Sequence, residues 1–313
     1  DALYVNAGSI KNTGVELGLF FWNFSTDLSQ KTFLWNADFR ITFARNEVTD
    51  LGLFTEVTDR NAPWGAYRMF GRDVEINRTV VGYAPGRFYG YKTEGLIHNS
   101  AELADYELTT GRKARVGDMK YSAEKSFIGD PNPNFTYNVE SFWQWGNWQL
   151  SLGLMGSYGN DVYNLVRQRI ESQTHGNRYC NLSANCMDFA RVETDAQGNA
   201  YVVNAGTSVP RPNFGNEAGG GSNVVSDRYV EDGSYLRIQN LSLTYMFKGW
   251  CNRYGCGSFF ENAYIRFGVE NLHTFTRYSG YDPENLGCAI RQGVDEGRYP
   301  SPRTYRITAG FKL

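Results

Sequence analysis

The sequence predicts an all-β fold, an antiparallel transmembrane β-barrel with long extracellular loops, and three observations support this prediction. Segments in which apolar and polar residues alternate recur along the chain. Aromatic residues are abundant, with 21 Tyr, 20 Phe and 7 Trp among 313 residues, which suits the aromatic girdles of such barrels. The connections between the alternating segments are in turn short and long, as in barrels with short turns on one side of the membrane and longer loops on the other.

The clearest element is a hairpin over residues 134–158. A two-residue turn at Gly146-Asn147, with Gly first, favours a type II′ turn and pairs Trp145 with Trp148. Phe135 then lies opposite Tyr158, and the apolar side chains of both strands share one face. The ten steps from Phe135 to Trp145 cover ~33 Å, or ~25 Å of height at a tilt of ~40°, which matches the apolar band of an outer-membrane barrel.

Other alternating segments predict further strands. Val15 to Phe21 and Phe33 to Phe43 are separated by a polar connection over residues 25–31. In residues 235–247 the apolar positions change from even to odd numbers, which predicts a β-bulge near Gln239-Asn240. Ile265 to Val269 and Tyr305 to Leu313 mark the last two strands.

The remaining segments complete a count of about nine strands. A hairpin is expected to turn at residues 84–87, between loops at 45–73 and 98–133. The segment 159–228 is a long excursion, with a short helix expected over 161–171, a tight turn over 195–199 and a Gly-rich tip at 215–221. If the C-terminus is periplasmic, every long loop is extracellular, provided that residues 85–86 form a periplasmic turn. A soluble antiparallel sandwich is the alternative fold.

Composition excludes a helical membrane protein and argues against a nucleic-acid-binding protein. The mean hydropathy is −0.48 and no apolar run approaches the ~18 residues of a spanning helix, so a helical membrane protein is excluded. The net charge is −2 and the basic residues are scattered, so we expect no nucleic-acid partner.

Five cysteines allow several readings. Cys180 and Cys186 lie in one loop, and Cys251 and Cys256 in one short connection, so each pair can close a small disulfide ring in an oxidising compartment. Free thiols and a zinc site are the alternatives, but none of the three His stands at ligand spacing to a Cys pair. Cys288 has no assigned partner.

We expect no catalytic, cofactor or metal site. His98, His175 and His273 have no catalytic spacing. Residues 195–199 lack the spacing of a calcium loop, and Gly219 to Gly221 follow no strand and open no helix, unlike a phosphate-binding loop.

Substrate-binding residues are not identified by the sequence. The side chains of the Trp hairpin that would face the barrel lumen are Asn138, Glu140, Phe142 and Gln144. Aromatic side chains in the long loops can stack on sugars, or can instead pack the loops together or contact a partner; these are Trp64, Tyr67, Tyr278 and Tyr281.

The chain also resembles a known family. It is similar to TonB-dependent outer-membrane receptors of the SusC/RagA type, in their barrel, through a series of motifs in the same order. These are residues 6–16, 35–51, 86–95, 117–121, 129–135, 156–164, 233–243, 271–284 and 299–305, for example Gly129-Asp130-Pro131-Asn132-Pro133-Asn134-Phe135 and Gly233-Ser234-Tyr235-Leu236-Arg237.

The resemblance implies a 22-stranded barrel of the bacterial outer membrane. Such a barrel imports oligosaccharides or peptides, with a SusD-like lipoprotein as lid and energy from TonB. The resemblance also implies that Asp282 and Glu284, which flank Pro283, shape a loop rather than form an acid pair. Residues 1–313 would be the C-terminal portion of that barrel, with the plug domain and the N-terminal strands absent from this chain. Nine strands cannot close a typical bacterial barrel, so further strands from the same protein or another chain must complete the wall.

Two other functions remain open at this stage. The barrel can be a structural scaffold in a surface assembly, or a small passive pore or adhesin complete in these residues, although the latter needs an even strand count.

Overall fold

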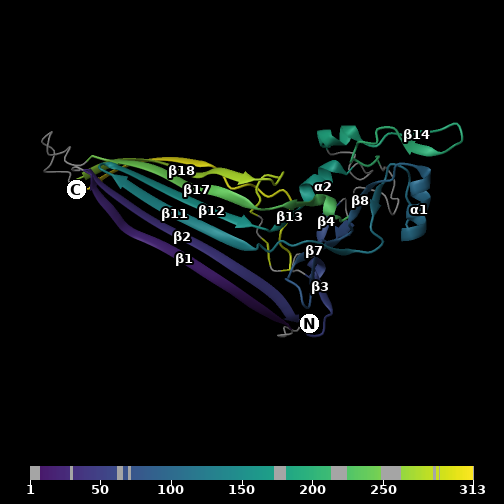
Figure 1. The fold of residues 1–313 in the computed structure, drawn as a ribbon, viewed down its shortest axis with the longest axis horizontal. Coiled ribbons are helices and arrows are strands. Elements are labelled where there is room, and N and C mark those ends of the chain that lie inside the picture. The colour runs from purple at the N-terminus through teal and green to yellow at the C-terminus, as the bar shows by residue number, and fades with distance from the viewer. Residues whose placement is uncertain are drawn as a thin grey trace.

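The computed structural model describes residues 8–28, 31–61, 66–69, 72–172, 181–212, 224–247, 262–284, 287–288 and 290–312. Its main element is one seven-stranded antiparallel sheet in the order β1-β2-β11-β12-β17-β18-β20 (Figure 1). The seven strands are β1 (Ser9–Leu28), β2 (Lys31–Asp50), β11 (Phe135–Trp145), β12 (Trp148–Tyr158), β17 (Tyr235–Met246), β18 (Asn262–Thr276) and β20 (Thr304–Lys312).

The Trp hairpin forms as predicted. β11 pairs with β12 from Phe135↔Tyr158 to Trp145↔Trp148 without a register shift. Gly146 has φ +58° and Asn147 has a negative φ, as a type II′ turn requires. The alternation and the turn together were sufficient to fix this register.

The predicted bulge is also present. The partners of β17 on both sides skip Gln239, so that Ile238 pairs with Leu154 and His273, and Asn240 with Gly153 and Glu270. The extra residue brings the apolar side chains on both sides of it onto one face of the sheet.

The first two strands are longer than predicted. β1 and β2 each contain 20 residues and run as far as the pair Leu28↔Lys31, so the polar connection expected over residues 25–31 is part of a hairpin. Twenty residues extend ~66 Å, about twice what the apolar band needs even when the strand is tilted. The ends of β1 and β2 therefore extend beyond that band.

The count of nine strands in the wall was wrong, since β2 pairs directly with β11. The turn at residues 84–87 does connect two antiparallel strands, β6 (Asn77–Val80) and β7 (Arg87–Gly90), but these have four residues each and lie in a separate four-stranded sheet. Phe88 is fully buried in a protein core. The turn therefore belongs to the excursion between β2 and β11 rather than to the opposite end of the wall.

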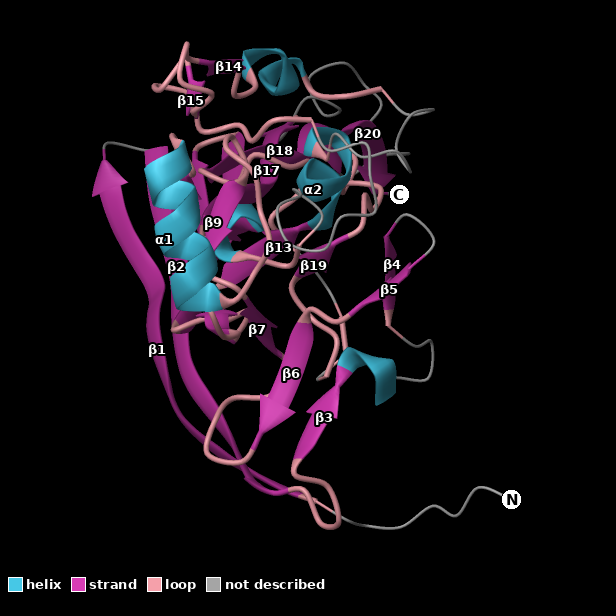
Figure 2. Ribbon diagram, turned by 90° about the vertical axis from the view of Figure 1, so that its right-hand side faces the viewer, coloured by secondary structure: helices cyan, strands magenta, loops and turns pink. Residues whose placement is uncertain are grey.

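The excursions between the wall strands together form a compact part that we call the loop body (Figure 2). Its short strands form small sheets and hairpins: β3 (Glu56–Thr58), β4 (Tyr67–Met69), β5 (Arg72–Val74), β6, β7, β8 (Thr93–Leu96), β9 (Met119–Tyr121), β10 (Ser126–Gly129), β13 (Asp161–Asn164), β14 (Val192–Thr194), β15 (Ala200–Val202), β16 (Val230–Asp232) and β19 (Val294–Asp295). Its helices are α1 (Ser100–Thr110) and α2 (Leu165–Glu171), with 3-10 turns η1 (Asp59–Asn61), η3 (Ala184–Asp188) and η4 (Asp227–Tyr229).

Local signals explain the helices and the small hairpin. The Asn99 side chain caps α1 by accepting from the Glu102 amide, and Gly111 ends the helix in the left-handed conformation. The helix expected over 161–171 begins only at Leu165, because residues 161–164 form β13. The turn over 195–199 joins β14 and β15 as predicted. Among the described helices, none is both long and apolar enough to span a membrane.

The loop body contains both buried cores of the described chain. One core gathers residues from several excursions around Phe88, Tyr163 and Tyr229, and the second lies around Ile97 and Tyr121. The outer face of the wall is different, because its apolar side chains stay exposed: Val15, Leu17, Leu19, Leu243, Ile265, Phe267 and Ile307 are 43–74% exposed. An apolar face of this size is expected to contact lipid.

The two ends of the wall differ. The strand pairs β1–β2, β11–β12 and β17–β18 each follow one another at the end where the C-terminus lies, and the loop body lies at the other end (Figure 1). The segments 45–73, 98–133, 159–228 and 274–303 therefore share one end, as predicted. The wall has two strands fewer than predicted, and because two is an even number, each long segment stays at the end of the wall that was predicted for it. The Gly-rich tip at 215–221 lies outside the described residues.

Candidate functional site

The inner face of the wall carries a row of polar side chains at one height, which we call the inner-face belt. The strand registers align Phe20, Asp38, Glu140, Gly153, Asn240, Glu270 and Thr304 across all seven strands. Three of these seven residues are carboxylates. The alternation of each strand places them opposite the apolar outer face.

The belt lines a groove of about 580 Å³. Asp38, Glu140 and Glu270 supply carboxylates to it, and Phe142 and Trp22 supply aromatic rings. Trp22 is 74% exposed. Aromatic rings beside carboxylates and amides can stack on sugar rings and accept hydrogen bonds from hydroxyl, amide or ammonium groups.

The carboxylates of the belt differ in their partners. Asp38 forms an ion pair with Arg40, 2.6 Å from Nη2 to Oδ2, and Glu270 forms one with Arg306 at 3.1 Å. Within the described part of the chain, Glu140 forms no ion pair. It is exposed on this face, so Glu140 is the carboxylate of the belt most available to a ligand.

The four lumen-facing candidates of the Trp hairpin have different surroundings. Glu140 and Phe142 line the groove, whereas Asn138 stands opposite Arg40 in the neighbouring strand. Gln144 accepts a hydrogen bond of 3.2 Å from Gln149 across the hairpin. Whether any of them binds a substrate is still a prediction.

Two of the four aromatic loop candidates do not provide a stacking surface. Tyr67 and Tyr278 are 2% and 6% exposed, and the Tyr278 hydroxyl donates to Asp295 at 2.6 Å, so both rings pack the loop body together. Tyr281 is 76% exposed, and Trp64 lies outside the described residues. For the two buried tyrosines, the alternative that they pack the loops together therefore holds.

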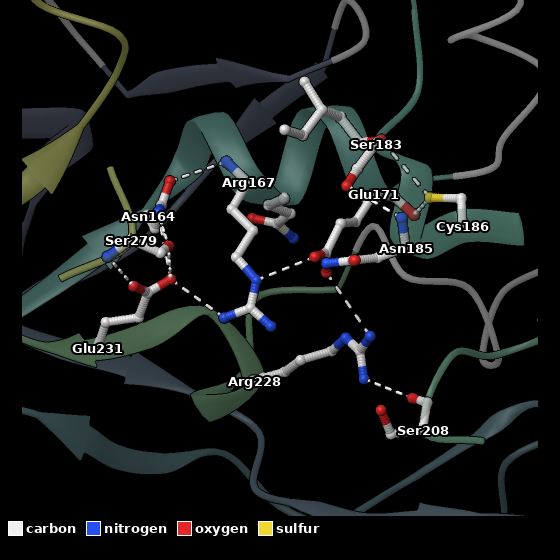
Figure 3. Close-up of polar contacts among 12 residues, drawn as sticks. Asn164, Arg167, Glu171, Ser183, Asn185, Cys186, Ser208, Arg228, Glu231 and Ser279 are labelled. Atoms are coloured by element: carbon white, nitrogen blue, oxygen red, sulfur yellow. Dashed lines mark hydrogen bonds and ion pairs between the residues drawn. The ribbon is translucent and has the colours of Figure 1, made fainter. Parts of the chain in front are cut away.

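A buried ionic network connects separate excursions of the loop body (Figure 3). Arg167 of α2 lies 3.1 Å from Glu171 and 3.0 Å from Glu231, and Glu171 also pairs with Arg228 at 3.6 Å. Glu231 accepts in addition from the amide and the hydroxyl of Ser279, both at 2.9 Å. Burial opposes the charge of Glu231, but these partners outweigh it and lower its pKa. The network joins residues 159–234 to the excursion before β20.

A second buried group holds the last excursion against the wall. Arg237 of β17 is 4% exposed in its side chain and pairs with both Asp282 and Glu284, the latter at 2.6 Å. Its Nε donates to the Thr274 hydroxyl at 2.9 Å. Asp282 and Glu284 thus shape a loop, as the family resemblance implied. Sequence patterns did not predict Arg237 as their partner, because it lies 45 residues before Asp282 and 47 before Glu284.

The cysteine and metal predictions are tested only in part. Cys186 is buried and its thiol contacts the carbonyl oxygens of Ile170 and Glu171, but Cys180, Cys251 and Cys256 lie outside the described residues, so both disulfides stay predictions. Among the described residues, no three His, Cys, Asp or Glu side chains are grouped to hold a metal ion. His175 also lies outside them.

These observations define the class of protein. An antiparallel sheet with an exposed apolar outer face, a polar inner face and all long excursions at one end is the wall of a membrane β-barrel. Solved structures agree on the fold. The chain superposes on the RagAB peptide transporter with a TM-score of 0.64 at 20% identity, covering 97% of this chain and 29% of that one, and on the same importer in its closed-closed state with a TM-score of 0.60.

Related sequences specify the class further. The chain is 25% identical over 327 residues to TonB-dependent receptor P3 of Formosa agariphila, 28% identical to receptor P26 of the same organism, and 23% identical to TonB-dependent receptor SusC of Bacteroides thetaiotaomicron. Each alignment covers 96–98% of this chain but only 26–29% of the relative. No family model matches. The resemblance to SusC/RagA-type TonB-dependent receptors is thereby confirmed, for a chain that spans less than a third of their length.

Proposed function

We propose that this chain is the C-terminal portion of the barrel of a longer TonB-dependent importer. The observation that supports this most is that β1 and β20 each pair on one side only within the described residues. Two open strand edges cannot face lipid, because their backbone groups have no partner there. Further strands and the plug domain are then supplied by residues beyond this sequence.

The proposed cargo is an oligosaccharide or a peptide. The named relatives are receptors and transporters rather than enzymes, and the RagAB structures are described as those of a peptide transporter and importer. A SusD-like lipoprotein over the loop body and TonB at the opposite side are the proposed partners, with the loop body extracellular and the C-terminus periplasmic. This chain then has no catalytic role, and outer-membrane lipid surrounds it.

Uptake by whole cells tests this function. In cells whose only copy of the full gene carries Glu140→Gln, we expect uptake of a labelled oligosaccharide or peptide to fall about tenfold, because hydrogen bonds to a charged acceptor contribute roughly 1.5–3 kcal/mol. Glu16→Gln is the matched control, since Glu16 is a carboxylate on the same face, opposite Thr42, and outside the groove.

The second candidate function, a surface scaffold, makes a different prediction. Deletion of the whole gene would then leave uptake unchanged, and dissipation of the proton-motive force would have no effect on it. Uptake that requires both the gene and the proton-motive force supports the importer. Uptake independent of the gene contradicts it.

A further inference from the structure

Two cationic side chains lie on the outer face of the wall, just beyond its apolar band. Lys11 and Arg45 belong to β1 and β2, in the same alternation as Val15, Leu17 and Phe43. Thr13 pairs with Arg45 and Val15 with Phe43. Two residues along a strand span ~6.6 Å, so Arg45 lies about that far beyond the last apolar row.

Arg45 lines a groove of about 770 Å³ on this face. The groove forms because β11 pairs with β2 only as far as Thr42, and the segment before β11 lies beside the outer part of β2. Asn134 adds an amide to its lining, whereas the amide of Asn132, which also lines it, is engaged by Pro85, Asp130 and Gln292. Phe43 and Phe135 add aromatic rings to the lining, with 5.5 Å between the ring centroids. The Phe135 ring also stacks on the ring of Tyr158, with 5.1 Å between the centroids.

Arg45 is the cation in the lining of this groove, and Lys11 lies two residues before Thr13, which also lines it. Within the described residues neither Arg45 nor Lys11 has an ion-pair partner, and both are exposed. Asp130 also lines the groove, but it pairs with Arg87 at 3.3 Å. Glu47 lies opposite Lys11 on the same face and opposes part of the positive charge.

We propose that this groove binds the phosphate-bearing headgroup of an outer-leaflet lipid. Arg45 and Lys11 pair with the phosphate, the Asn134 amide contacts the headgroup, and the acyl chains lie along Val15, Leu17 and Phe43. A free anion can pair with the two cations but cannot cover the adjoining apolar band. A lipid can do both, because its phosphate pairs with the cations and its acyl chains cover the exposed apolar residues. This inference depends on the membrane position of the wall but not on the proposed transport.

Native mass spectrometry of the full receptor in detergent tests the proposal. The probe is lipid A with two phosphates, compared with phosphatidylcholine, which carries no net charge. We expect lipid A to be retained, and retention to fall about fivefold in Arg45→Gln and more in the Lys11→Gln/Arg45→Gln double variant, from about 1 kcal/mol per cation near a charged surface. Glu47→Gln should increase retention because it removes the opposing charge.

Arg191→Gln is the matched control, since Arg191 is an exposed arginine directly before β14, a strand of the loop body. It should retain lipid A as the unsubstituted receptor does. Resistance of the folded barrel to denaturation by detergent without heating establishes that each variant is folded. Equal retention by Arg45→Gln overturns the proposal, and so does displacement of lipid A by millimolar inorganic phosphate, which would identify a site for soluble anions.

Discussion

Replacement of Arg237 by Met is expected to release the last excursion from the wall. The substitution leaves Asp282 and Glu284 without their cation, in a place where the arginine side chain is only 4% exposed. Removal of one partner of a buried ion pair costs about 3–5 kcal/mol, because the remaining charge keeps its desolvation penalty. Hydrogen exchange should therefore show amides of residues 276–303 losing protection by two orders of magnitude or more, while the strands of the wall keep theirs.

Arg306→Met is the matched control for this prediction. Arg306 also pairs with a glutamate, Glu270, but the two side chains are 65% and 47% exposed. Exposed pairs contribute roughly 0–1 kcal/mol, so exchange around this pair should change less than tenfold. If Arg237→Met and Arg306→Met had equal effects, the buried ion triad would not be what holds the excursion.

Replacement of Gly156 by Val is expected to destabilise the wall itself. The position that a Cβ would occupy at Gly156 is already filled by the ring of Tyr137 and by the backbone carbonyl of Tyr235. The Tyr137 hydroxyl also donates a hydrogen bond of 3.1 Å to the carbonyl oxygen of Tyr235. Overpacking costs typically 1–3 kcal/mol and the lost hydrogen bond about 1 kcal/mol, so we expect the free energy of unfolding to fall by about 2–4 kcal/mol.

Urea unfolding of the full receptor in detergent, followed by tryptophan fluorescence, measures this loss. Gly268→Ala in β18 is the control, because the nearest atom to its Cβ position is the Ser242 Cβ at 3.8 Å, an ordinary contact. The control should unfold at the same urea concentration as the unsubstituted protein, or slightly above it. A Gly156→Val variant as stable as the control would show that the tyrosine does not occupy this place.

The sequence predicts local features of this fold better than the role of each strand. The register of the Trp hairpin and the bulge at Gln239 followed from alternation and turn chemistry, which act over a few residues. The hairpin that turns at residues 84–87 was counted among the wall strands, although Phe88 faces a protein core. A period of two shows that one face is apolar, but not whether lipid or protein covers it.

The candidate site was also predicted in its local features but not in its contacts between distant segments. The alternation of β11 placed Glu140 and Phe142 on the inner face, and the structure adds the groove that they share. The partnership of Arg237 with Asp282 and Glu284 and the burial of Tyr278 depend on contacts between distant segments. Without an alignment of relatives such contacts leave no signal in one sequence, which is why the ionic connections of the loop body were missed.

The central claim is that this chain is one part of a longer polypeptide, whose other residues complete the barrel wall. The most direct test is the mass, under denaturing conditions, of the polypeptide that carries this sequence in outer membranes. The 327 residues aligned with receptor P3 are 29% of that relative, so we predict a mass roughly three times the 35.4 kDa of this chain. A mass of 35.4 kDa would contradict the claim, because seven strands with two open edges would then have to close by assembly of separate chains.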